Sequence, residues 1–102
     1  MDPLSHLLVS IVTVCTMPMH EGPAQCEAHV EYLTKPYVME RCQEIAEKAA
    51  KNVMVDLLTK DSTRLPTLAK GICVFPADAP ALLNQLPAFF ESNGIKYTVK
   101  YY

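Results

Sequence analysis

Residues 71–102 have the sequence GICVFPADAPALLNQLPAFFESNGIKYTVKYY, and this stretch decides the fold class. The apolar run 71–75 predicts a strand, and the segment 78–92, which opens with an aspartate and a proline suited to a helix start, predicts a helix. Residues 95–102 alternate between apolar and polar side chains and predict a second strand. Pro87 lacks an N–H group, so we expect it to kink or split the helix. A strand, a helix and a strand with such short links favour a parallel, right-handed crossover.

The preceding part of the chain supplies three further elements and two loops. A β-branched run over residues 6–16 is apolar on both alternating faces and predicts an interior strand. Residues 17–24 contain prolines and a glycine and are expected to form a loop. For residues 25–35 a short helix is favoured, with a strand as the alternative, because helical and alternating spacings are both present. Residues 34–57 have the clearest helical stripe, whereas residues 59–70 are polar, contain a proline and predict the longest loop.

These elements predict a small two-layer sandwich of the α+β or α/β class. The favoured order is βααβαβ, and the alternative is ββαβαβ, a ferredoxin-like arrangement. We expect residues 1–102 to form a single domain, because this length suits one hydrophobic core.

The order of elements is similar to that of the small α/β sandwiches of the ClpS adaptor and of the C-terminal domain of the ribosomal stalk protein. The resemblance rests on the pattern from Ile72 through Asn93 to the last strand, and its residues are mainly core types. A ClpS-like recognition pocket also needs an Asn-Asp-Asp cluster after the first strand, where this chain has Cys15, Thr16 and Met17. The resemblance therefore implies a fold and no site residues.

The charge balance argues against nucleic acid as a partner. The chain has 9 Lys and Arg residues and 11 Asp and Glu residues, giving a net charge of −2, without the basic excess that phosphate binding requires. The apolar run 7–15 is far shorter than the ~20 residues that span a bilayer. We therefore expect no membrane partner either.

The four cysteines are Cys15, Cys26, Cys42 and Cys73. In an exported protein they would permit three disulfide connectivities. However, residues 2–3 are Asp and Pro where an export signal carries Lys or Arg, so we expect no export. This predicts a cytoplasmic protein with reduced cysteines that pack as small hydrophobic residues.

One set of residues, His20, Cys26 and His29, suits a metal or a thiol reaction. Cys26 and His29 have a spacing compatible with two zinc ligands, but a structural site needs four ligands and no second pair exists. Cys26 also lies beside Glu27, whose charge disfavours the thiolate. The three glycines are isolated and build no phosphate loop. We therefore expect no enzyme activity, no cofactor and no metal, and the alternative function is a metal-binding or thiol-dependent module that uses these three residues.

The favoured function is the binding of another protein, or self-association into a homo-oligomer, by an adaptor, inhibitor or assembly component. Sheet edges, aromatic side chains and loops are common in such contacts. The expected contact residues are Lys96, Thr98, Lys100 and Tyr102 on the last strand and Asp61 and Arg64 on the 59–70 loop.

Overall fold

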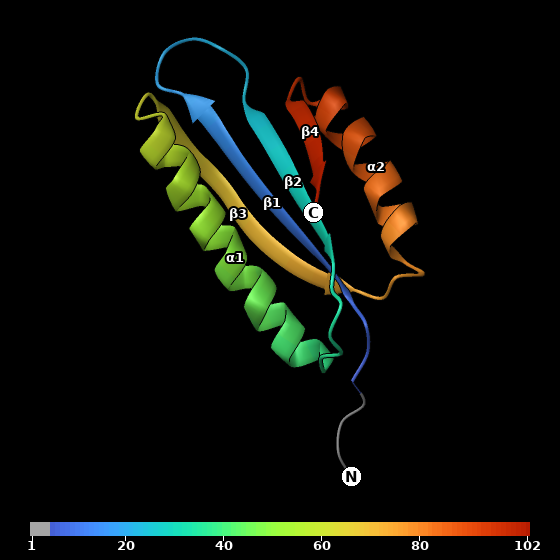
Figure 1. Ribbon diagram of the computed structural model, residues 1–102. Coiled ribbons are helices and arrows are strands. Elements are labelled where there is room, and N and C mark those ends of the chain that lie inside the picture. The colour runs from blue at the N-terminus through green and yellow to red at the C-terminus, as the bar shows by residue number, and fades with distance from the viewer. Residues whose placement is uncertain (1–4) are drawn as a thin grey trace.

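The fold is a four-stranded sheet with one helix packed against each face (Figure 1). The computed structural model describes residues 5–102. Along the chain the elements are β1 (Val9–Pro18), β2 (Gln25–Tyr32), α1 (Met39–Lys60), β3 (Arg64–Val74), α2 (Ala79–Ser92) and β4 (Lys96–Tyr101). The strands lie in the order β3-β1-β2-β4, with β1 antiparallel to both of its neighbours and β4 parallel to β2.

The predicted class, a small sandwich of helices and a sheet, is confirmed, and each helix forms a two-layer sandwich with its side of the sheet. The element order is the alternative one, ββαβαβ, because residues 25–32 form β2 in place of the favoured short helix. It differs from the βαββαβ order of ferredoxin-like folds. The pairing makes β3 and β4 parallel to each other, as the strand-helix-strand pattern predicts, with β1 and β2 between them.

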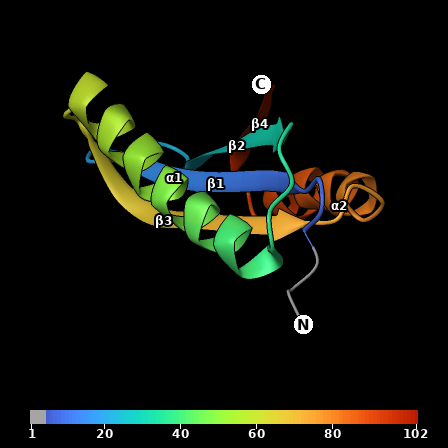
Figure 2. The same ribbon diagram turned by 60° about the horizontal axis from the view of Figure 1, so that its bottom comes forward.

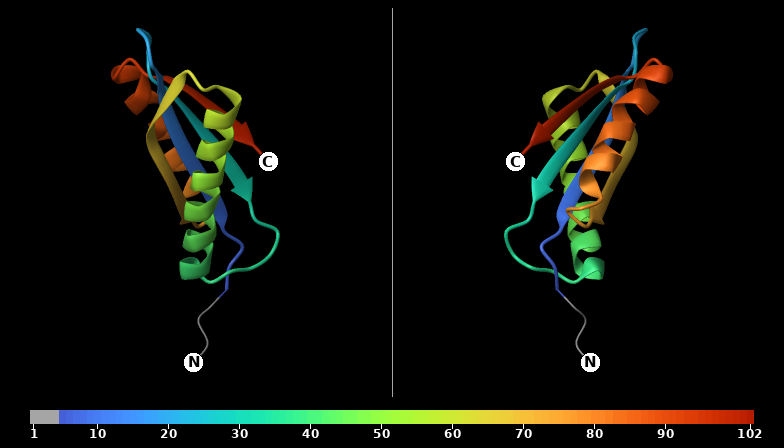
Figure 3. Two further views of the ribbon diagram at one scale, coloured as in Figure 1. Left: turned by 90° about the vertical axis from the view of Figure 1, so that its left-hand side faces the viewer. Right: turned by 90° about the vertical axis from the view of Figure 1, so that its right-hand side faces the viewer.

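The central strand β1 is buried on both faces. Val12 and Val14 belong to the core under α1, whereas Val9, Ile11 and Cys15 belong to the core under α2. Because successive side chains of a strand point to opposite faces, the two helices lie on opposite sides of the sheet. The two views in Figure 3 each place one helix in front of the sheet. This arrangement explains why both alternating faces of the first strand are apolar.

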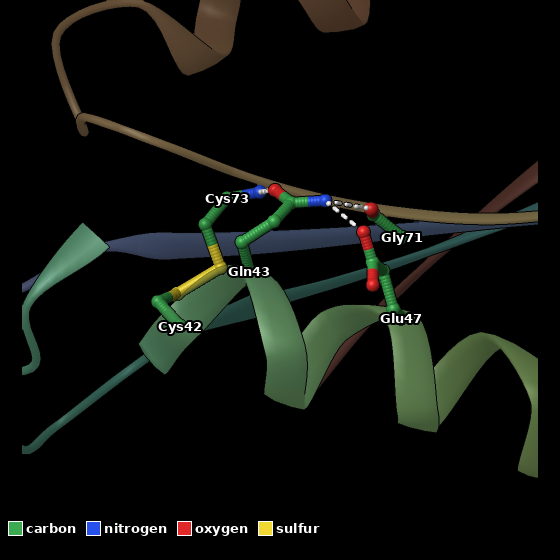
Figure 4. The surroundings of a disulfide bond; sticks show 5 residues. All are labelled: Cys42, Gln43, Glu47, Gly71 and Cys73. Carbon is green, nitrogen blue, oxygen red and sulfur yellow. Dashed lines mark hydrogen bonds between the residues drawn. A yellow bond between two sulfur atoms is a disulfide. The ribbon is translucent and has the colours of Figure 1, made fainter. Parts of the chain in front are cut away.

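α1 lies close against β3 because Gly71 has no side chain. A Cβ atom at Gly71 would lie 2.0 Å from the carbonyl oxygen of Ala46 in α1. Beside it, the Gln43 carboxamide donates to the Gly71 carbonyl oxygen (2.7 Å) and accepts from the Cys73 N–H (3.0 Å), as Figure 4 shows. Both backbone groups lie on the free edge of β3, so the Gln43 side chain takes the place of a neighbouring strand.

Two disulfides contradict the predictions of reduced cysteines and of a cytoplasmic location. Cys15–Cys26 joins facing residues of β1 and β2, and Cys42–Cys73 joins α1 to β3. Disulfides form and persist in oxidising environments, such as the outside of the cell, and are rare in the cytosol. Both predictions are therefore wrong. The comparison with an export signal rested on residues 2–3, which lie outside the described part of the chain.

The predicted loop 59–70 is mostly regular structure, so this prediction is wrong as well. α1 and β3 are connected by a short turn over residues 61–63. Thr67 is an extra residue in β3, since the partners of two successive β1 residues are 68 and 66. Pro66 therefore lies beside a β-bulge in an edge strand, where a missing N–H is tolerated.

The helices also differ from their predicted bounds. α1 begins at Met39 instead of residue 34, because His6 and Tyr37 form a β-bridge that keeps the chain extended before the helix. α2 continues through Pro87 without a break, so the proline does not split it. Among residues 5–102, no helix is both long enough and apolar enough to cross a membrane.

Candidate functional site

The two helices leave part of each sheet face uncovered. α1 packs on β1 and β3, which leaves β2 and β4 open on that side (Figure 2). α2 packs on β1, β2 and β4, which leaves the first part of β3 open on the other side. The open residues on the α1 side are polar, and we call them the polar half-face: Gln25, Glu27, His29, Glu31, Lys96, Thr98 and Lys100.

The polar half-face contains most of the contact residues predicted from the sequence. Lys96, Thr98 and Lys100 pair with residues 25, 27 and 29 of β2 and share their face. Tyr102 follows β4 and stacks its ring on His29, with 5.4 Å between the ring centroids. The last strand therefore presents these four side chains together, as its alternation predicts.

A hydrogen-bonded network links the two strands of the polar half-face. His29 Nε2 lies 3.1 Å from Glu27 Oε2, and the Tyr102 hydroxyl lies 3.0 Å from His29 Nδ1. With its proton on Nε2, the imidazole donates to Glu27 and accepts from Tyr102. Lys100 Nζ lies 3.7 Å from the same Glu27 oxygen. The network ties the end of β4 to β2.

Asp61, in the turn after α1, and Arg64, the first residue of β3, lie across a small cavity from this network. The cavity has a volume of about 170 Å³, and Glu27 of the polar half-face also lines it. Asp61 accepts hydrogen bonds from the Thr63 hydroxyl (2.5 Å) and N–H (3.0 Å), which lower the pKa of its carboxyl group. Arg64 donates to the Thr16 hydroxyl at 2.6 Å. Both side chains are thus held by local partners.

The three residues considered for a metal or thiol site do not come together. Cys26 is bonded to Cys15 under α2, whereas His29 lies on the α1 side, because residues three apart in a strand point to opposite faces. His20 is exposed in the turn between β1 and β2. Among residues 5–102, no group of three His, Cys, Asp or Glu side chains is placed to hold a metal ion.

The last strand lies at a sheet edge, and its outer side is open. The Lys96 N–H donates to the Ala24 carbonyl (3.0 Å) and the Tyr102 N–H to the Val30 carbonyl (2.9 Å), so even-numbered residues of β4 turn their backbone groups toward β2. The groups on the free edge therefore belong to Tyr97, Val99 and Tyr101.

Tyr97 packs into the core although its hydroxyl is polar. Its ring stacks on Phe90, with 4.8 Å between the centroids, beside the Cys15–Cys26 disulfide. Burial raises the pKa of the hydroxyl. Its oxygen has no hydrogen-bond partner in the described part of the chain. Tyr97 therefore contributes to packing, whereas Tyr101 is exposed.

The uncovered part of the sheet on the α2 side is apolar. We call it the apolar half-face and define it by Met17, Leu65, Leu68 and Ile72 of the sheet. Three of these side chains are exposed: Met17 by 42%, Leu65 by 42% and Leu68 by 43%. Phe89 of α2 faces the same region and is 61% exposed. A groove of about 320 Å³ runs between α2 and this part of the sheet.

The sequence did not reveal this surface because a β-bulge hides its pattern. Leu65 and Leu68 are three residues apart, a spacing that places side chains on opposite faces of a regular strand. Because Thr67 is an extra residue, both leucines point to the same face of the sheet. Leu65 lies opposite Met17 there, and Leu68 lies opposite Cys15. A proline and polar neighbours made the same segment resemble a loop. The two leucines themselves were the only available signal.

No protein-family model, curated protein or solved structure matches the chain. Its function must therefore be argued from its own surfaces.

Proposed function

We propose that the chain is a small, non-enzymatic protein-binding domain that acts as an adaptor, inhibitor or assembly component in an oxidising compartment. The contrast between the two half-faces is the observation that supports this proposal best. The polar half-face carries charged and polar side chains, while the apolar half-face exposes Met17, Leu65 and Leu68 near Phe89 of α2, beside a groove. Single exposed apolar residues are ordinary, but a contiguous patch of them is typical of an interaction surface.

The apolar half-face is large enough to contribute to binding. Complete burial of one such side chain is worth about 1.5–3 kcal/mol, and these side chains are roughly half buried already. Covering the remaining surface of Met17, Leu65, Leu68 and Phe89 therefore gains about 3–6 kcal/mol before the costs of association. This gain is comparable to that of one or two interface hot spots.

The free edge of β4 is a second candidate surface for the same function. Its open backbone groups are suited to pairing with a strand of another chain or of a second copy. Lys96 and Lys100 flank this edge, and lysines there disfavour indiscriminate strand pairing. A partner strand at β4 is therefore expected to carry acidic residues.

Matched variants test the proposal. The disulfide-bonded protein and three variants are used to capture proteins from the fluid or tissue in which the chain is made. Leu68→Asp changes the apolar half-face, and Lys96→Glu with Lys100→Glu changes the β4 edge. Val55→Asp is the control, because Val55 is 64% exposed on α1, away from both surfaces. We expect Leu68→Asp to lose a protein that the control retains.

The outcomes show which of the two surfaces binds the partner. If Leu68→Asp captures everything that the control captures, the apolar half-face is not the binding surface. If the double lysine variant leaves the captured complex unchanged, the β4 edge is not used. Sedimentation of each variant shows whether the retained partner is a second copy of the chain.

A further inference from the structure

We propose that the apolar half-face binds an amphipathic α-helix of another protein, with an acidic side chain of that helix opposite Lys70. The inference rests on the proposed function and specifies the chemistry of the partner. It is carried by the dimensions of the uncovered surface, by the walls of the groove and by the position of its single charge.

One helix is enough to cover the open surface, which consists of β3 and the end of β1 at Met17, because α2 already covers Ile11 and Cys15. A helix with its side chains is about 10 Å wide and covers two strands that are about 4.8 Å apart. α1 covers β1 and β3 in this way on the opposite side of the sheet. On the α2 side, the open part of β3 and the groove together run from Leu65 to Ile72, which lie opposite residues 17 and 11 of β1 and are therefore about 20 Å apart. A helix of about 13 residues has that length.

α2 supplies the second wall of the groove. Leu82, Leu86 and Phe89 line the groove at steps of four and three residues, so they form one ridge along the helix. A second helix at the usual interaxial distance of about 8–10 Å from α2 would rest on Leu68 and Ile72. An apolar stripe with the same helical steps would contact both walls at once.

An added strand suits this region less well than a helix. Gln43 already bonds the Gly71 carbonyl and the Cys73 N–H on the free edge of β3. Pro66 has no N–H to offer. The open surface consists of side chains that project from the face of the sheet, and such a surface binds a helix through its apolar stripe.

The charge of Lys70 determines which charge a helix bound in the groove must carry. It is the one charged side chain among the described residues that line the groove. Its partner across the strands is Thr13, which also lines the groove. Within residues 5–102, no carboxylate forms an ion pair with Lys70. A helix that covers the groove removes water from Lys70, so a carboxylate on that helix is needed to compensate the charge.

Designed peptides test the inference. The first probe is an amphipathic helix of about 13 residues, built from leucine, alanine, lysine and glutamate, with one glutamate inside its leucine stripe. The second has the same composition in an alternating, strand-like order, and the third has lysine in place of the stripe glutamate. Calorimetry gives the dissociation constants, and backbone NMR shifts locate the bound peptide. Dodecanoate is included as an apolar ligand with a carboxylate.

We expect the first peptide to bind and to shift signals of β1, β3 and α2. Leu68→Asp weakens this binding at least about tenfold, and Val55→Asp leaves it unchanged. Lys70→Glu weakens it about fivefold, as expected for loss of one ion pair. The third peptide then binds Lys70→Glu better than it binds the unmodified protein.

Three results would overturn the inference. The inference fails if the strand-like peptide binds as tightly as the helical one, or if dodecanoate displaces the helical peptide from the groove. It also fails if a second copy of the chain occupies the groove in a dimer that Leu68→Asp dissociates. If Leu68→Asp loses its captured partner but no helical peptide binds, the helix inference fails while the proposed function stands. If the helical peptide binds but capture is unaffected by Leu68→Asp, the proposed surface fails.

Discussion

Replacement of Gly71 by alanine tests how α1 is seated on the sheet. The added Cβ atom would lie 2.0 Å from the Ala46 carbonyl oxygen and 2.8 Å from the Glu47 nitrogen. Both are backbone atoms, so no side-chain rotation relieves the contact. Since ordinary contacts of this kind are 3.4 Å or longer, α1 and β3 must separate by more than an ångström. That shift also pulls Gln43 away from the edge of β3.

The expected cost is several kcal/mol. Overpacking of this kind costs about 1–3 kcal/mol, and each of the two lost Gln43 hydrogen bonds costs about 0.5–1.5 kcal/mol. The reduced flexibility of the unfolded chain returns about 0.4–1 kcal/mol. The net loss of unfolding free energy is therefore about 1–6 kcal/mol, a large part of the total for a domain of this size.

Urea unfolding of the disulfide-bonded protein measures this loss, with two matched variants beside it. Gly94→Ala is the control, because Gly94 has φ of 70° and open space around its Cβ position, so only backbone strain of about 1 kcal/mol is expected. Gln43→Ala isolates the two hydrogen bonds and should cost about 1–3 kcal/mol. It also provides the test if Gly71→Ala accumulates no folded protein. The reasoning is refuted if Gly71→Ala costs no more than Gly94→Ala, or if Gln43→Ala costs nothing.

Three other measurements address the covalent links, the buried tyrosine and α2. Loop-closure entropy predicts that removal of the Cys42–Cys73 disulfide, with a separation of 31 residues, lowers the unfolding free energy by about 3.7 kcal/mol. Removal of Cys15–Cys26, with a separation of 11, lowers it by about 2.8 kcal/mol. A denaturing thiol assay should find no free thiols before reduction. The pKa of Tyr97 is raised above 10.0, so the folded state keeps a proton that the unfolded state releases, and stability should fall as pH rises beyond about 10. Unfolding of Tyr97→Phe should be less sensitive to pH in that range, and an equal sensitivity would contradict the buried position of the hydroxyl. α2 contains no cysteine and so lacks the covalent anchor that α1 has, and its amides should exchange with deuterium faster than those of α1.

Local patterns predict an element correctly where its apolar spacing matches the face that the element buries in the fold. The first strand, the long helix and the strand-helix-strand block have apolar spacings that match the faces they bury. Residues 25–32 have two compatible spacings, and antiparallel pairing with β1 selects the strand. That choice depends on the rest of the sheet, so the local sequence leaves it open.

The error at the cysteines has a similar origin. Cys15 and Cys26 become partners only once β1 and β2 pair in a register that sets them opposite each other. Cys42 and Cys73 meet because Gly71 lets α1 approach β3 closely. The number of cysteines permits these pairings but does not select them. The prediction of reduced thiols failed with the location prediction, because it followed from the expectation that the protein is not exported.

The apolar half-face shows why exposed leucines in this fold point to function more than to stability. A four-stranded sheet with one helix on each face leaves an uncovered area on both sides, because neither helix covers all four strands. On the α1 side this area is filled with charged and polar residues, which shows that the fold tolerates them in such a position. Leu65 and Leu68 are similarly exposed, and each is less than two-thirds buried. Their apolar character therefore contributes little to the stability of the chain itself. Their exposure to water is compensated only when another surface covers them, and for that reason the binding surface is best sought there.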